Sequence, residues 1–172
     1  MKFTNKLTIL IVILIGMQAF CKGQQQDFLQ HKLPSCNIKD INGKTINTSD
    51  IANDGKPVLL CFWKTCCKSP INLLNAIDEV YEDWIDETGV VLYAVSVDDV
   101  RNTNLVAPFV NGKGWEFEVL LDPNFEFKHA MNVVLIPHIF LINGNGEIVW
   151  QKATYIPGDE EEIYEQLIDI VK

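Results

Sequence analysis

The stretch VLLCFWKTCCKSP, residues 58–70, decides the fold, because it joins a strand to a helix at a pair of cysteines. Its first six residues are uniformly apolar, as in a strand that is buried on both faces. From Ser69 to Trp84 the apolar residues recur mostly at steps of three, which predicts one amphipathic helix. Pro70 falls in the first turn, where its missing N–H costs nothing. The cysteine pair therefore lies where a buried strand ends and a helix begins.

Strand and helix patterns alternate along the rest of the chain. A hairpin is expected around Asn42-Gly43, a strong turn signal. The helix after the second buried strand should end at Gly112 or Gly114. The expected strands are 36–41, 44–48, 56–64, 89–99, 117–122, 134–142 and 147–153, and the expected helices are 69–84, 101–114, 123–133 and 158–172. This order predicts an α/β fold with a central mixed sheet, helices on both faces and no second domain.

The N-terminal residues have the order of a secretory signal peptide. Two lysines precede the apolar stretch LTILIVILIG at residues 7–16, which is too short to span a membrane. Small residues and then polar KGQQQ follow. We predict a signal peptide at 1–23, an N-terminal arm at 24–35 and a folded domain at 36–172. Cleavage after Gly23 is favoured over cleavage after Ala19 or Cys21.

These N-terminal features predict an exported, periplasmic protein whose mature chain has no transmembrane span. The alternative is a lipoprotein anchored at Cys21, although bulky Phe20 does not suit the position before a lipidated cysteine. Removal of residues 1–23 would leave 11 basic and 23 acidic residues and change the net charge from −9 to −12. Such an acidic domain does not favour nucleic acid or an anionic membrane as a partner.

Three segments resemble the thioredoxin-fold redoxins, and more narrowly their exported TlpA/ResA-like branch. They are LPSCNIKDINGKTI, VLLCFWKTCCKSP and LIPHIFLINGNGEIVW. The segment VLLDPNFEFKHAMNV is similar to the extra strand-helix insert of that branch. The resemblance covers about residues 30–172 and implies a thioredoxin-like fold with an N-terminal β-hairpin.

The cysteine motif departs from the pattern of that family, F-W-A-x-W-C-x-x-C. Cys67 matches the first, attacking cysteine, whereas Pro70 replaces the second, resolving one. Cys66 stands where the family has a tryptophan. Cys61 stands where thioredoxins carry the buried aspartate that takes the resolving thiol's proton. The resolving thiol and that aspartate are thus both absent from the atypical C-C-x-x-P motif.

Cys67 and Cys66 are the candidate catalytic residues. A helix N-terminus with Lys64 and Lys68 nearby favours a thiolate at Cys67, the attacking species in disulfide exchange. The alternative is a half-buried remnant of an ancestral site. Cys66 either resolves a mixed disulfide on Cys67 through a strained bond or packs where the family has tryptophan.

The other candidate residues have weaker signals. Cys36 is either a distant resolving thiol or a core residue, and Cys61 is expected in the core. The resemblance implies a cis Ile136–Pro137 bond, with the backbone of Ile136 and the side chain of Trp63, expected to be partly exposed, meeting the substrate. His138 is the residue after Pro137, and a structural role is favoured for it over a catalytic one.

We therefore predict a cell-envelope thiol-disulfide exchange protein of the isomerase or monothiol type, without a metal or other cofactor. Its partners would be proteins with disulfides or thiols and a membrane electron donor. One alternative is a non-catalytic binding module that uses the groove beside Pro137. A thiol peroxidase is less favoured, because Thr65 and Pro57 lack the required spacing to Cys67. Cu(I) carriage by Cys66, Cys67 and His138 is less favoured still, because adjacent cysteines rarely both ligate one ion.

Overall fold

The computed structural model describes residues 32–52 and 54–172, so the predicted signal peptide and residues 24–31 of the predicted arm lie outside the described residues. The rest of the arm belongs to the packed unit, which runs from Lys32 to Lys172. Leu33 is buried, and Lys32 forms a β-bridge with Glu147. No helix in the described part of the chain is long and apolar enough to cross a membrane.

A seven-stranded mixed sheet forms the centre of this unit, in the order β2-β1-β5-β4-β3-β6-β7. Strands β3, β4 and β5 run parallel, and β6 runs antiparallel to β3. The strands are β1 (Asn37–Asp40), β2 (Thr45–Asn47), β3 (Val58–Trp63), β4 (Val91–Ser96), β5 (Glu118–Leu121), β6 (His138–Ile142) and β7 (Ile148–Ala153). The mixed α/β architecture predicted from the sequence is confirmed.

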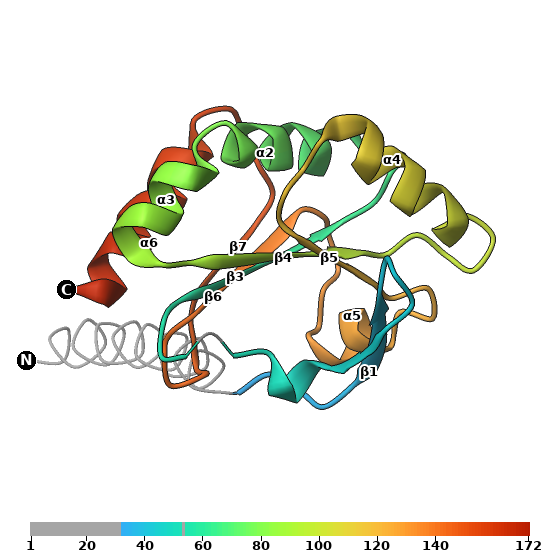
Figure 1. The fold of residues 1–172 in the computed structure, drawn as a ribbon, viewed down its shortest axis with the longest axis horizontal. Coiled ribbons are helices and arrows are strands. Elements are labelled where there is room, and N and C mark those ends of the chain that lie inside the picture. The colour runs from blue at the N-terminus through green and yellow to red at the C-terminus, as the bar shows by residue number, and fades with distance from the viewer. Residues whose placement is uncertain (1–31, 53) are drawn as a thin grey trace, which may run out of the picture. The chain divides into compact units, whose positions relative to one another are not determined.

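Helices cover both faces of the sheet (Figure 1). The helices α2, α3, α4 and α6 form one layer, and α5 lies on the opposite side. The α-helices are α2 (Lys68–Asp78), α3 (Tyr81–Thr88), α4 (Val106–Lys113), α5 (Glu126–Ala130) and α6 (Asp159–Val171). Helix α4 ends at Gly114, which has the left-handed conformation that glycine adopts without steric cost. This ending agrees with one of the two predicted from the sequence.

Strand β3 is buried along its whole length because both layers contact it. Leu59, Cys61 and Trp63 belong to the core shared with α2, α3, α4 and α6. Phe62, which lies between Cys61 and Trp63 in the strand, faces the opposite side of the sheet. Its ring centroid lies 5.3 Å from that of Phe127 on α5. Period-two alternation along the strand thus sends consecutive residues into two different cores.

The prediction of a single helix over 69–84 is wrong, because the structure has two helices, α2 and α3, in this segment. Val80 has φ −122° and ψ 4°, outside the helical range, and separates α2 from α3. The apolar period nevertheless continues across the break, and Ile77, Tyr81 and Trp84 are all buried. The sequence could not reveal the break because the same face stays apolar on both sides of it.

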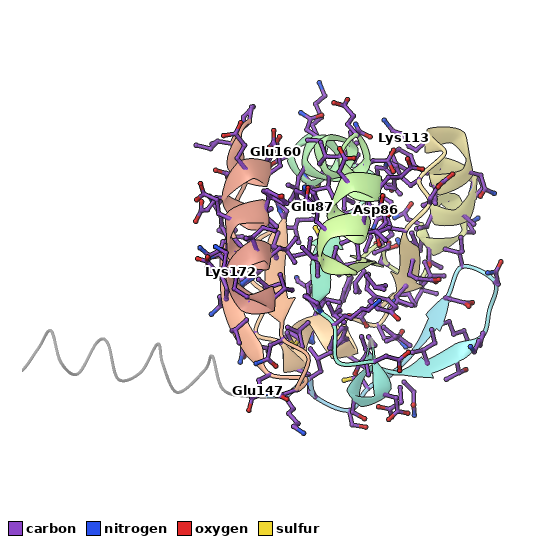
Figure 2. The ribbon with its side chains drawn as sticks, turned by 60° about the vertical axis from the view of Figure 1, so that its left-hand side comes forward. Asp86, Glu87, Lys113, Glu147, Glu160 and Lys172 are labelled. Carbon is purple, nitrogen blue, oxygen red and sulfur yellow. The ribbon has the colours of Figure 1, made fainter. Side chains whose placement is uncertain are left out.

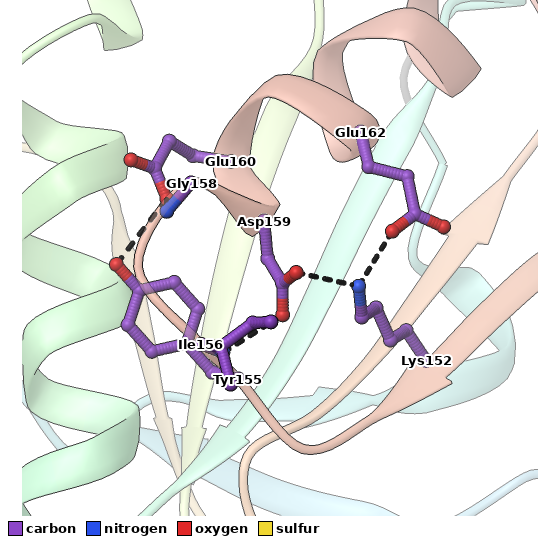
Figure 3. Close-up of polar contacts among 7 residues, drawn as sticks. All are labelled: Lys152, Tyr155, Ile156, Gly158, Asp159, Glu160 and Glu162. Atoms are coloured by element: carbon purple, nitrogen blue, oxygen red, sulfur yellow. Dashed lines mark hydrogen bonds and ion pairs between the residues drawn. The ribbon is translucent and has the colours of Figure 1, made fainter.

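Helix α6 is held at its N-terminus by a polar cluster (Figure 3). Lys152 on β7 forms ion pairs with Asp159 at 2.8 Å and with Glu162 at 2.5 Å. The other carboxylate oxygen of Asp159 accepts the N–H of Ile156 at 2.8 Å. These contacts tie β7 to the helix, which buries Ile163 against the central core. The acidic first turn also complements the positive end of the helix dipole.

Acidic side chains gather on the helix layer. Figure 2 shows Asp86 and Glu87 on α3 and Glu160 at the start of α6. The first turns of α3 and α6 carry Glu82, Asp83 and Asp159–Glu162. Carboxylates on this layer would repel polyanions such as the phosphates of nucleic acid.

Candidate functional site

Cys66 and Cys67 lie where β3 passes into α2. Cys67 is the N-cap residue of α2, with extended backbone angles, and its N–H donates to the carbonyl of Lys64 at 3.1 Å. Cys66 is exposed and Cys67 is half-buried, and their Sγ atoms are 3.6 Å apart. The four cysteines of the described part carry no disulfide bond. The two thiols are therefore neighbours in space as well as in sequence.

The loop before the cysteines is anchored to Asp98, which follows β4 and is 1% exposed. Its carboxylate accepts the N–H of Thr65 at 3.0 Å and the Thr65 hydroxyl at 2.6 Å. The hydroxyl of Ser96 donates to the same carboxylate at 2.9 Å. Because Thr65 precedes Cys66, this network fixes the backbone that presents the thiols.

The sequence reasoning missed the role of Asp98. The sequence does contain a signal for this role, in the segment VSVDD at residues 95–99, where acidic residues directly follow a buried strand. The carboxyl ends of parallel strands meet at one edge of a sheet, where functional side chains collect. Strands β3 and β4 pair in parallel, with Trp63 opposite Ser96. The residues that follow these two strands, Thr65 and Asp98, therefore meet at this edge.

The Ile136–Pro137 bond is cis, as the resemblance implied. Phe62 pairs with His138, so the start of β6, just after Ile136 and Pro137, lies beside the end of β3 that leads to the thiols. Within residues 32–52 and 54–172, no backbone hydrogen bond involves the N–H or carbonyl of Ile136. The strand β6 begins only at His138, so Pro137 precedes the strand and does not interrupt it. The backbone of Ile136 is thus available to an added polypeptide strand.

The side chain of Trp63 does not meet the surface. We expected partial exposure, but the side chain is 0% exposed, so that expectation is wrong. Its ring packs among Phe109 and Trp115, with ring centroids at 5.7 and 5.2 Å. The alternation of β3 directs Trp63 into the helix-side core, which the sequence of the strand end did not disclose. Trp63 therefore packs in the core behind the site, and its side chain does not contact a bound polypeptide chain.

The surroundings of Cys67 favour the protonated thiol. Partial burial raises its pKa, the neighbouring Cys66 thiol and the Asp98 carboxylate raise it further, and Lys64 lowers it. The sequence had predicted a lowered pKa from the helix N-terminus and from nearby lysines. Lys64 does act in that direction, but burial and the adjacent thiol outweigh it. A thiol with a high pKa is ionised in a smaller fraction of the molecules, but the thiolate that it forms is a stronger nucleophile.

Replacement of Cys66 by alanine is expected to lower the pKa of Cys67, because it removes a hydrogen bond and a like charge that disfavour the thiolate. The rate of iodoacetamide labelling at Cys67, followed against pH by mass spectrometry, measures this shift. Cys36→Ala is the matched control and should leave the Cys67 profile unchanged. An unchanged or raised pKa in Cys66→Ala would contradict the assigned coupling.

Replacement of Asp98 by asparagine should have two separable effects. Loss of the charge lowers the pKa of Cys67, since this carboxylate raises it. Loss of one buried acceptor for Thr65 or Ser96 lowers the free energy of unfolding by about 1–3 kcal/mol. Urea unfolding and the labelling profile of Cys67 measure the two effects. Glu165→Gln, at an exposed carboxylate on α6, is the control for a surface charge change.

The remaining cysteines are placed away from the two thiols. Cys61 is fully buried, and burial raises the pKa of its thiol to about 12, so it is inert. Cys36 precedes β1, which is three strands away from β3 in the sheet. At about 4.8 Å per strand this separation is roughly 14 Å, beyond the reach of a disulfide.

His138 does not join the thiols in a metal site. Its Nε2 lies 3.0 Å from the amide oxygen of Gln151, and its ring stacks on Phe140 at 4.3 Å. Burial lowers the pKa of the imidazole. No group of three potential metal ligands occurs among the residues that the structure describes. These contacts favour the structural role expected for His138.

An apolar rim surrounds this edge of the sheet. We use that name for five exposed residues in the segments that follow β4, precede β6 and follow β7, namely Val100, Leu105, Val134, Leu135 and Ile156. Val134, two residues before Ile136, is 82% exposed. The three segments adjoin strand ends at the same edge of the sheet as the thiols, and exposed apolar side chains there suit contact with a bound chain.

The fold and this edge define the chain as a thioredoxin-like protein. The AhpC/TSA family model matches residues 29–151, and the chain belongs to that family. A solved relative, an uncharacterized thioredoxin-like protein from Porphyromonas gingivalis, is 48% identical with a TM-score of 0.74, covering 81% of this chain and 91% of that one. StoA from Bacillus subtilis is 25% identical with a TM-score of 0.61, covering 77% of this chain and 97% of that one.

The curated relatives are oxidoreductases by name. The thiol-disulfide oxidoreductase ResA of Bacillus thuringiensis (strain Al Hakam) is 30% identical over 86% of this chain and 87% of its own. The sporulation thiol-disulfide oxidoreductase A of Bacillus subtilis is 26% identical over 94% of this chain and 96% of its own. The chain is thus a relative of ResA- and StoA-type proteins, as the sequence motifs had suggested.

Proposed function

We propose that this protein is a cell-envelope thiol-disulfide exchange protein in which Cys67 is the attacking thiol. The observation that carries the proposal is the position of Cys67. It is a half-buried thiol at the start of α2, at the same sheet edge as the backbone of Ile136, which lies beside cis-Pro137 and forms no backbone hydrogen bond within the described part of the chain. A substrate polypeptide would pair with Ile136 and cover part of the apolar rim. Its disulfide would then lie against the Cys67 thiolate.

The absent thiol at position 70 favours isomerase or monothiol exchange. Pro70 is buried in the first turn of α2, so this position supplies no nucleophile. After Cys67 attacks, the mixed disulfide must be released by another thiol. A second thiol of the same substrate can do so, which regenerates Cys67 and leaves the substrate with a rearranged disulfide. The partners would be proteins with disulfides or thiols, and a membrane electron donor would keep Cys67 reduced.

A reshuffling assay tests this proposal. The purified protein, at catalytic concentration with a small-molecule thiol, should accelerate recovery of activity from scrambled ribonuclease. It should reduce insulin slowly by comparison, because position 70 carries no thiol and a disulfide between adjacent cysteines would be strained. Recovery no faster than with the small-molecule thiol alone would refute exchange activity.

Export of the protein rests on its N-terminal sequence. We expect the mature chain to begin at Gln24, so the intact mass of protein from a cell-envelope fraction should correspond to residues 24–172. A diacylglycerol-modified Cys21 would establish the lipoprotein alternative instead. A full-length chain in the cytoplasmic fraction would contradict export.

A second candidate is a binding module without chemistry. The observations that favour it are the buried Pro70 and the raised pKa of Cys67. In this case the groove beside Pro137 and the apolar rim would bind extended peptides. Replacement of all mature cysteines would then leave peptide affinity and cellular function unchanged, whereas exchange activity requires Cys67.

A further inference from the structure

We infer that Cys66 is the release thiol of this site and closes a disulfide with its own neighbour, Cys67. This inference rests on the proposed function, since it needs a mixed disulfide on Cys67. It adds a route by which the protein frees itself from a substrate that offers no second thiol. The route passes through residues 66 and 67 and makes no use of position 70.

Proximity supports this assignment. The Sγ atoms of Cys66 and Cys67 are 3.6 Å apart in the reduced protein, close to the separation of reacting atoms poised for attack. Cys66 is exposed, so its thiol is accessible when a substrate sulfur occupies Cys67. The two Sγ atoms must still approach to about 2.05 Å, which strains the backbone between the adjacent residues.

The positions of the other described cysteines also support the assignment of Cys66 as the release thiol. Among the described residues, the other two cysteines cannot reach Cys67. Cys61 is 0% exposed and directed into the helix-side core. Cys36 lies beyond β4 and β5, three strands away. Cys66 is thus the one cysteine of the described part that can attack without a rearrangement of the sheet.

The loop is built to hold Cys66 in place. Thr65 is fixed by two hydrogen bonds to the buried Asp98, at 3.0 and 2.6 Å. The N–H of Cys67 is fixed by the carbonyl of Lys64 at 3.1 Å. Cys66 lies between these two anchored residues, so little conformational entropy remains to be lost when its thiol attacks.

The chemistry balances within the protein and its substrate. The Cys67 thiolate first attacks a substrate disulfide, which forms a mixed disulfide and releases one substrate thiolate. The Cys66 thiolate then attacks the Sγ of Cys67, which forms the Cys66–Cys67 bond and releases the second substrate thiolate. The substrate has gained two electrons and the protein has lost two. A low-molecular-weight thiol or a dithiol protein returns them and restores both thiols.

The bond between adjacent cysteines is transient for a geometric reason. Neighbouring Cα atoms are about 3.8 Å apart across a trans peptide, whereas disulfides prefer roughly 4.4–6.8 Å. The strained bond is therefore easily reduced. It serves to release Cys67 from a trapped substrate and does not persist as the resting form.

Oxidised glutathione as a model substrate tests the inference. The reduced purified protein is mixed with it, quenched in acid at intervals and alkylated, and the peptide with both cysteines is analysed by mass spectrometry. In the wild type we expect brief glutathionylation of Cys67, then a peptide two hydrogens lighter without glutathione. In Cys66→Ser the mixed disulfide should last at least about tenfold longer, as expected when an intramolecular attack is lost. Cys36→Ser is the matched control and should behave as the wild type.

The outcomes separate the two proposals. Equal lifetimes of the mixed disulfide in wild type and Cys66→Ser, with no lighter peptide, would overturn the role of Cys66 and leave exchange at Cys67 intact. No glutathione on Cys67 in either protein would overturn the proposed exchange function and the release step together.

Discussion

Replacement of Cys67 by serine should abolish exchange activity, with a fall of at least about a hundredfold in the catalysed reshuffling rate. A serine hydroxyl is nearly isosteric with the thiol but forms no disulfide, so no mixed disulfide can arise at this position. The side chain of Cys67 makes no capping hydrogen bond to α2. Because serine is a preferred N-cap residue, the free energy of unfolding should not fall and should rise by about 0.5–1 kcal/mol if the new hydroxyl caps α2.

The measurement is the initial rate of ribonuclease reshuffling, alongside urea unfolding of the same samples. Cys36→Ser is the matched control, because Cys36 is also half-buried but lies three strands away in the sheet. It should retain wild-type rates. Activity retained in Cys67→Ser, or lost equally in Cys36→Ser, would show that Cys67 is not the attacking thiol.

Replacement of Trp63 by alanine should lower the free energy of unfolding by about 3–5 kcal/mol. The side chain is wholly buried and packs against Phe109 and Trp115, so its removal leaves a large cavity that the sheet cannot close. Trp63→Phe keeps most of the volume and should cost less. Urea unfolding monitored by circular dichroism measures both changes, since the far-ultraviolet signal does not depend on the lost tryptophan.

A matched control separates the core role of Trp63 from a role in binding. Val134→Ala removes an apolar side chain that is 82% exposed at the apolar rim, so it should leave stability unchanged while it weakens substrate binding. Trp63→Phe should do the reverse, with a lower stability and an unchanged KM for the folded fraction. A raised KM without loss of stability in Trp63→Phe would restore the substrate contact first expected for this residue.

The order of elements could be predicted because apolar periodicity reports burial directly. The uniformly apolar run at β3, the Asn42-Gly43 turn and the Gly114 helix end each have a local physical cause that is visible in the chain. The break at Val80 could not be predicted, because the buried face continues through it. Periodicity shows which residues are buried and does not show whether the backbone bends between them.

The features of the candidate site also separate into those that the sequence could predict and those that it could not. The sequence by itself determined that Cys66 and Cys67 follow a buried strand, that a proline replaces the second thiol of the motif, and that another proline precedes the last pair of strands. These are properties of local order along the chain. Tertiary structure alone decided that Asp98 anchors Thr65, that the Cys66 and Cys67 thiols are 3.6 Å apart, and that Trp63 faces the core. Those features depend on the pairing of β3 with β4 and on the face toward which each side chain points. The sequence does not show them, because parallel pairing brings together residues that lie far apart along the chain.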